Sequence, residues 1–125
     1  MSKVLIVDDE PSFLTLLQLE LSVAGFETAV AADGRTALRR IESEKPDVVL
    51  LDIMMPVLDG WEVLKLLREQ NGPQPRVIVV TAKSAEIGLE RALELGADGF
   101  MSKPFDADKL IATVKDLAKK GLRTR

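Results

Sequence analysis

The chain contains 125 residues, of which 46% are hydrophobic and 30% are charged, and its formal net charge is −3; these values are typical of one soluble domain with its own hydrophobic core. Because the sequence has neither cysteine nor histidine, it excludes a disulfide framework, a zinc–thiolate site, a thiol nucleophile and an imidazole base. No apolar run is long enough to span a bilayer and no secretory signal is recognisable, so we expect a cytoplasmic protein without membrane contact. The negative net charge disfavours direct binding of nucleic acid.

Apolar runs and turn residues predict five strands that alternate with five helices. Pro11 suits the first position of a helix, Gly25 suits its C-terminal stop, and Ser84 is a predicted N-cap. Asp59-Gly60 marks a turn or an N-cap. In chain order, the predicted elements are strand 3–7, helix 11–24, strand 26–31, helix 35–43, strand 48–52, helix 61–70, strand 76–81, helix 84–95, strand 98–102 and helix 105–120.

This alternation, with loops of a few residues, is the βαβ repeat that forms a parallel sheet with right-handed crossovers. We therefore predict a flavodoxin-like, doubly wound (βα)5 fold of the α/β class, a three-layer sandwich around a five-stranded parallel sheet. The commonest arrangement of five such units has the strand order 2-1-3-4-5. Residues 1–120 are expected to form this domain, and residues 121–125 a basic tail or the start of a linker.

Polar side chains stand where four of the predicted strands end: Asp8 and Asp9, Asp52, Thr81, and Lys103. Taken singly, each has an ordinary explanation as a helix cap, a strand-end residue or a surface lysine. Together they are less easily explained that way, because the carboxyl ends of parallel strands meet at one edge, where such sheets bind ligands. In the predicted strand order the three carboxylates converge.

Carboxylates that converge repel one another unless a cation compensates them. Without histidine or cysteine, the ligands of a metal here must be oxygens, which favours Mg²⁺, Mn²⁺ or Ca²⁺. A metal, the Lys103 ammonium and the Thr81 hydroxyl around Asp52 suit acceptance of a phosphoryl group. The Asp52 oxygen would attack phosphorus while the cations neutralise the equatorial oxygens.

With these residues, the chain resembles the receiver domains of bacterial two-component response regulators, from residue 3 to about residue 119. The resemblance implies that Asp52 is the residue that becomes phosphorylated. It also implies that the domain, with Asp52, Thr81 and Lys103, catalyses only its own phosphorylation and dephosphorylation. The motifs that carry it are Val7-Asp8-Asp9-Glu10, Leu51-Asp52-Ile53-Met54-Met55-Pro56 with Asp59-Gly60, Val79-Val80-Thr81-Ala82, Gly96-Ala97-Asp98-Gly99-Phe100 and Ser102-Lys103-Pro104-Phe105.

The resemblance also implies the ligands of each group. A Mg²⁺ cofactor would be held by Asp9, Asp52 and the backbone carbonyl of Met54, with Asp8 acting largely through water. The phosphoryl group would be bound by Thr81, Ala82 and Lys103. The Lys103-Pro104 peptide is expected to be cis, which would aim the lysine inward.

A conformational switch is implied as well. Thr81 would move toward phosphorylated Asp52, and Phe100 would turn into the vacated space. The face made by helix 84–95, strand 98–102 and helix 105–120 would change its affinity for partners. Phe100 lacks the hydroxyl of the tyrosine often found there, and it is equally explained as a plain core aromatic. The implied partners are a sensor histidine kinase or histidine phosphotransfer protein and a downstream protein or output domain, with a possible phosphorylation-dependent homodimer.

Other interpretations remain open. A haloacid dehalogenase-like phosphatase also uses an Asp nucleophile with Mg²⁺, but its Asp-x-Asp pattern differs from Asp8-Asp9. A flavodoxin-like nucleotide or FMN binder would need a phosphate loop where Asp8-Asp9-Glu10 stands. A degenerate receiver would act as a phosphorylation-independent interaction module. Receivers that dimerise ahead of winged-helix output domains are disfavoured, because Asp98-Gly99-Phe100 and Ala112-Thr113 depart from their pattern.

Overall fold

The computed structural model describes residues 2–55, 58–82 and 85–123. The strands are β1 (Lys3–Val7), β2 (Glu27–Ala31), β3 (Val48–Asp52), β4 (Arg76–Thr81) and β5 (Gly99–Ser102). The helices are α1 (Pro11–Val23), α2 (Gly34–Glu44), α3 (Gly60–Arg68), α4 (Ala85–Glu94) and α5 (Ala107–Lys120). All strand pairs are parallel and the order is β2-β1-β3-β4-β5, which confirms the predicted fold.

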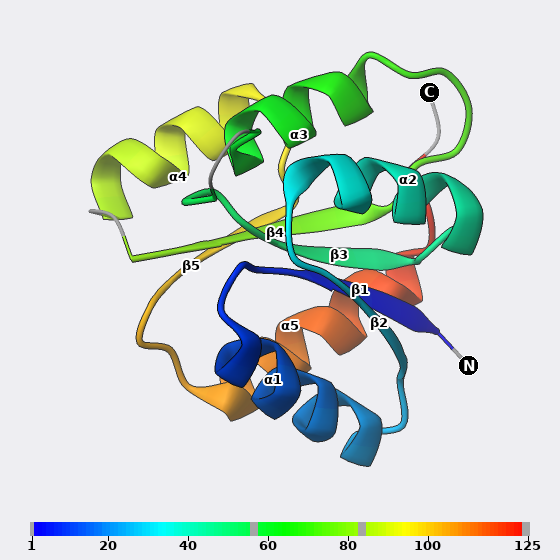
Figure 1. The fold of residues 1–125 in the computed structure, drawn as a ribbon, viewed down its shortest axis with the longest axis vertical. Coiled ribbons are helices and arrows are strands. Elements are labelled where there is room, and N and C mark those ends of the chain that lie inside the picture. The colour runs from blue at the N-terminus through cyan, green and yellow to red at the C-terminus, as the bar shows by residue number, and fades with distance from the viewer. Residues whose placement is uncertain (1, 56–57, 83–84, 124–125) are drawn as a thin grey trace.

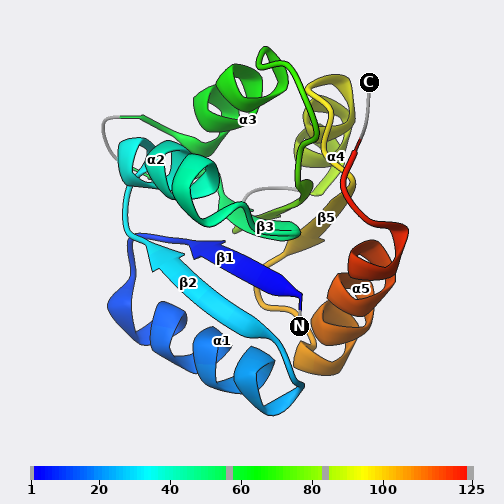
Figure 2. The same cartoon turned by 90° about the vertical axis from the view of Figure 1, so that its right-hand side faces the viewer.

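The sheet lies between two layers of helices. Helices α2, α3 and α4 cover one face, and α1 and α5 cover the other (Figures 1 and 2). The pairing of β1 with β3 brings Val7 level with Leu51, and the pairing of β3 with β4 brings Asp52 level with Val80. The segments that follow β1, β3, β4 and β5 therefore leave the sheet at one edge.

Each central strand contributes side chains to two separate cores, because successive side chains point to opposite faces. In β3, Val49 and Leu51 belong to one core, and Val48 and Leu50 belong to the other. Burial on both faces explains the unbroken apolar run of this strand. The helical residues of the first core are Ala37, Ile41, Val63, Leu64, Leu67 and Ala92, and those of the second are Leu14, Leu17, Leu21, Leu110, Val114 and Leu117.

Side-chain caps decide where several helices begin. Asp33 accepts a hydrogen bond from the Thr36 N–H at 2.8 Å, so α2 begins at Gly34, one residue earlier than predicted. Asp59 caps α3 in the same way. Asp106 caps α5, which therefore begins two residues later than predicted. The predicted cap Ser84 lies outside the described residues.

The segment after α5 packs against the residues around the start of β4. The backbones of Gln74 and Arg123 exchange hydrogen bonds of 2.9 and 2.7 Å in an antiparallel bridge. The Arg76 Nε also donates to the Gly121 carbonyl at 2.9 Å. Residues 121–123 are therefore attached to the loop that precedes β4. In the described ranges, no helix is long and apolar enough to cross a membrane.

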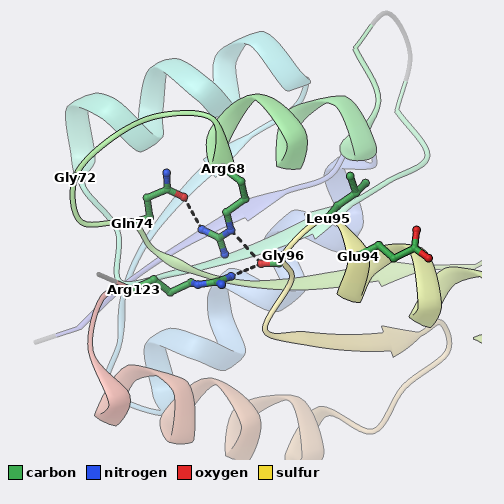
Figure 3. A pocket seen from close by; sticks show the side chains of 7 residues that line it. All are labelled: Arg68, Gly72, Gln74, Glu94, Leu95, Gly96 and Arg123. Atoms are coloured by element: carbon green, nitrogen blue, oxygen red, sulfur yellow. Dashed lines mark hydrogen bonds between the residues drawn. The ribbon is translucent and has the colours of Figure 1, made fainter. Parts of the chain in front are cut away.

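A pocket of about 210 Å³ lies beside this bridge (Figure 3). The Arg68 guanidinium donates to Gln74 at 2.7 Å and to the Gly96 carbonyl at 3.0 Å, and Arg123 donates to the same carbonyl. The lining segments precede β4 and β5, so the pocket lies at the opposite edge of the sheet from Asp52. Arg68 and Arg123 also lie 3.0 and 3.8 Å from Asp98 Oδ2, so these contacts connect parts of the fold to one another.

Candidate functional site

Three carboxylates converge at the carboxyl edge of the sheet, as predicted. One oxygen from each of Asp8, Asp9 and Asp52 lies within 4.8 Å of the others. Asp8 and Asp52 are buried, with 1% and 6% of their surface exposed, whereas Asp9 is exposed. The neighbouring positions of β1 and β3 produce this cluster, because both strands end beside the same crevice.

Backbone N–H groups orient the two buried carboxylates. The Glu10 N–H donates to Asp8 Oδ1 at 2.9 Å, and the Met54 N–H donates to Asp52 Oδ1 at 3.0 Å. In both cases the donor lies two residues after the carboxylate, which is the local turn that Asp commonly forms. Each carboxylate therefore has its second oxygen directed to other partners.

The ammonium group of Lys103 forms ion pairs with the second oxygens of Asp8 and Asp52. Its Nζ lies 2.8 Å from Asp8 Oδ2 and 3.7 Å from Asp52 Oδ2. The Lys103 N–H donates to the Thr81 carbonyl at 2.8 Å, and the Lys103-Pro104 peptide is cis, as predicted. Burial alone would lower the pKa of Lys103, but the hydrogen bond to Asp8 and the charges of Asp52 and Asp8 raise it above its usual value. Lys103 therefore stays cationic at neutral pH.

The pKa of Asp52 is raised above its usual value. Burial is the largest cause, and the nearby charges of Asp8 and Asp9 act in the same direction. The Met54 N–H and the charge of Lys103 oppose this shift without cancelling it. A further cation beside Asp52 would oppose this shift, because it would stabilise the ionised carboxylate.

The donor set fits a hard divalent metal. The cluster offers carboxylate oxygens, which are the ligands that Mg²⁺ prefers, and the exposed Asp9 leaves room for the water ligands that Mg²⁺ usually keeps. Asp8, Asp9 and Asp52 are thus the residues able to hold such an ion.

The remaining predicted site residues differ in their burial. Thr81 ends β4 and is fully buried, Ala82 is exposed, and the Met54 side chain is 51% exposed. Phe100 is half-buried on β5, where its ring lies so close to Gly88 of α4 that a Cβ on this glycine would stand 2.6 Å from the ring.

One contact at the site was not predicted from the sequence. The Lys103 Nζ lies over the ring of Phe13, 4.0 Å from its centroid, and Phe13 packs edge-to-face on Phe105 with the centroids 5.8 Å apart. An apolar groove of about 490 Å³ adjoins this contact; its lining residues are Phe13, Leu16, Leu17, Glu20, Ala82, Lys103, Pro104, Phe105 and Ala107.

The fold and the site together define a class of protein: a doubly wound α/β domain with an acidic, lysine-containing site at the switch point of its sheet. The profile of the response regulator receiver domain matches residues 4–115. The chain belongs to this family, whose members act in two-component signalling, and it is not a classical enzyme.

Individual relatives agree with this assignment. The alkaline phosphatase synthesis transcriptional regulatory protein PhoP of Bacillus subtilis is 46% identical over 94% of this chain and 49% of PhoP. The DNA-binding response regulator MtrA of Mycolicibacterium smegmatis is 39% identical over 90% of this chain and 49% of MtrA. The solved receiver domain of the Francisella response regulator 1452 is 39% identical, with a TM-score of 0.88, over 96% of this chain and 98% of that one. The chain thus spans about half the length of the curated relatives PhoP and MtrA.

Proposed function

We propose that this receiver domain accepts a phosphoryl group on Asp52 from a sensor histidine kinase or a histidine phosphotransfer protein, with Mg²⁺ as cofactor. The observation that carries the proposal is the Lys103 ammonium, which lies 2.8 Å from Asp8 and 3.7 Å from Asp52 within the carboxylate cluster. An ion pair for stability alone would need one carboxylate, whereas this ammonium pairs with two, and the carboxylate of Asp9 lies in the same cluster.

In the proposed reaction, an Asp52 oxygen forms a bond to phosphorus while the bond from phosphorus to the donor's imidazole nitrogen breaks and its electron pair stays on nitrogen. The Met54 N–H holds Oδ1, and Oδ2 faces the ammonium. Lys103 then neutralises the transferred group, with the Thr81 hydroxyl and the Ala82 N–H as further donors. A bound Mg²⁺, with Asp8, Asp9, Asp52 and the Met54 carbonyl as ligands, would supply further positive charge.

The same proposal includes a switch. Thr81 moves toward the phosphorylated Asp52, Phe100 follows, and the face of α4, β5 and α5 alters its binding of a downstream protein, an output domain or a second receiver. The packing of Phe100 against Gly88 supports a coupling to α4. Because Phe100 has no hydroxyl, packing alone sets the balance between its two positions.

We also propose that residues 1–120 act as the receiver unit, and that residues 121–125 form a basic connecting segment that makes no direct contact with nucleic acid. The DNA-binding role in the name MtrA belongs to a protein about twice as long. The bridge of Arg123 to Gln74 supports a connection that begins close to the domain surface.

The first test is the intact mass after incubation with acetyl phosphate and Mg²⁺. Wild type should gain one phosphoryl adduct that requires Mg²⁺, Asp52→Ala should gain none, and Asp116→Ala, which removes an exposed carboxylate of α5, should behave as wild type. Absence of an adduct under conditions in which Mg²⁺ binds would instead indicate a phosphorylation-independent interaction module. Turnover of a phosphomonoester would indicate a phosphatase.

The lifetime of the adduct tests the role of Met54. Its apolar side chain cannot orient a water molecule toward phosphorus, so we expect slower hydrolysis in wild type than in Met54→Asn. The decay of the adduct mass after removal of the phosphodonor measures both rates. Equal or faster decay of wild type would contradict this role.

A further inference from the structure

Three groups hold the Lys103 ammonium in place. Two are the carboxylates of Asp8 and Asp52, and the third is the Phe13 ring, 4.0 Å below the ammonium measured to its centroid. The negative face of an aromatic ring attracts a cation at this distance. Because the Lys103 side chain is 21% exposed on a stem of four methylene groups, its position depends on such contacts.

The ring itself is fixed by its neighbours. Phe105, two residues after the lysine, meets Phe13 edge-to-face at an interplanar angle of 79°. Both rings also pack against the core between the sheet and helices α1 and α5. The contact therefore joins α1 to the segment that carries Lys103, so the ammonium has a rigid support from outside its own loop.

This support differs from the carboxylates in one respect. The charge at Asp8 and Asp52 is shared with any cation that binds them, so their attraction for Lys103 weakens when a metal ion is bound. The ring is neutral and keeps its attraction throughout. Its contribution is therefore largest when a metal ion is bound and the ammonium must remain near Asp52 before the phosphoryl group arrives.

We propose that Phe13 is a positioning residue for phosphoryl transfer, which holds the Lys103 ammonium beside Asp52. This inference rests on the proposed function. Phe13 also forms part of the wall of the apolar groove beside the lysine. Shortening the ring would enlarge this groove next to the ammonium and allow Lys103 to turn away from the carboxylates.

The test compares Phe13→Leu, which removes the ring, with Phe13→Tyr, which keeps it. Phe26→Leu is the matched control, because it removes a phenyl group from the same core at a position outside the groove that Lys103 lines. Phosphorylation by acetyl phosphate at saturating Mg²⁺ should slow about three- to tenfold in Phe13→Leu. Phe13→Tyr and Phe26→Leu should react at the wild-type rate. Urea unfolding confirms that each variant is folded.

Two readouts separate positioning from a purely structural effect. In metal-free wild type, the Lys103 ε-methylene protons should be displaced upfield by the ring current of Phe13; their signal is identified by its loss in Lys103→Arg. The displacement should persist in Phe13→Tyr and vanish in Phe13→Leu. In a Lys103→Ala background, Phe13→Leu should change the residual rate by less than about twofold, because the two residues act as a unit.

Each outcome decides between the proposals. A wild-type rate in Phe13→Leu, or an equal slowing with and without the Lys103 side chain, would overturn the positioning role while the proposed function stands. A wild type that forms no adduct would overturn the proposed function. The ε-methylene signal would still be informative in that case. An upfield displacement that is lost in Phe13→Leu would establish the contact between the ring and the ammonium, and its absence would refute it.

Discussion

Asp98 is the residue whose removal should destabilise the fold most clearly without touching the candidate site. Its Oδ2 accepts the Val77 N–H at 2.9 Å and an Arg68 N–H at 3.0 Å, and its Oδ1 accepts from Arg76 at 3.1 Å. Arg123 lies farther away, at 3.8 Å. Asp98→Ala would therefore leave three guanidinium groups and a backbone N–H without their shared acceptor.

The expected magnitude follows from the burial of these groups. The Asp98 side chain is 9% exposed and that of Arg68 is 14% exposed. Burial, followed by the charges of Arg123 and Arg76, lowers the pKa of Arg68 to about 10, although Asp98 acts in the opposite direction. Breaking a buried pair costs about 3–5 kcal/mol, and because Arg76 and Arg123 are more exposed and can be hydrated, we expect about 3 kcal/mol.

Urea unfolding at neutral pH, followed by the fluorescence of Trp61, measures this loss. Asp116→Ala is the control, because it removes an exposed carboxylate and should change the free energy of unfolding by less than about 0.5 kcal/mol. A loss below about 1 kcal/mol in Asp98→Ala would refute the reasoning, since it would place the network among solvated surface pairs.

Further predictions concern the edge that carries the site. Gly60→Ala should destabilise by about 2 kcal/mol and slow phosphorylation, because a Cβ there would lie 2.5 Å from both the Asp52 carbonyl oxygen and the Ile53 Cα, and crowding by backbone outweighs the gain in helix propensity; an unchanged urea midpoint would contradict this. Asp52→Asn should stabilise the protein in EDTA at neutral pH. The pKa of Asp52 is raised in the native state, so the stability of wild type falls as pH rises from the usual Asp pKa of 3.8 through the native pKa. Equal urea unfolding curves for the two proteins would contradict this. The bonds from the Thr36 N–H and hydroxyl lower the pKa of Asp33, so the destabilisation by Asp33→Ala should be full above pH 3.8 and fade as pH falls through the native pKa, which urea curves at several pH values can test.

Much of the architecture follows from local sequence patterns. The apolar run from Val48 to Leu51 predicts a strand buried on both faces. The strand order then places Asp8 beside Asp52. These features were predictable because a buried strand and a parallel sheet edge each leave a signal in contiguous residues. The errors at helix ends were of one or two residues, where the capping side chain decides the boundary.

Contacts between distant segments left no such signal. Phe13 and Lys103 are separated by most of the chain, and an aromatic residue on an inward helix face is ordinarily core. The closer approach of Lys103 to Asp8 than to Asp52 depends on the path of the loop after β5. The bridge between Gln74 and Arg123 joins two segments without strand patterns, so the sequence did not predict this contact.

The two cores share no buried residue among those described. Phe100 packs on the core beneath α2, α3 and α4, whereas Phe13 packs on the core beneath α1 and α5. Substitutions in well-separated, unconnected sets of contacts tend to act additively. The sheet is therefore a partition between two compartments that can vary independently. Repacking around Phe100 should alter the surface proposed to meet partners and leave the support of the lysine intact, so one chemical site can serve many different recognition surfaces.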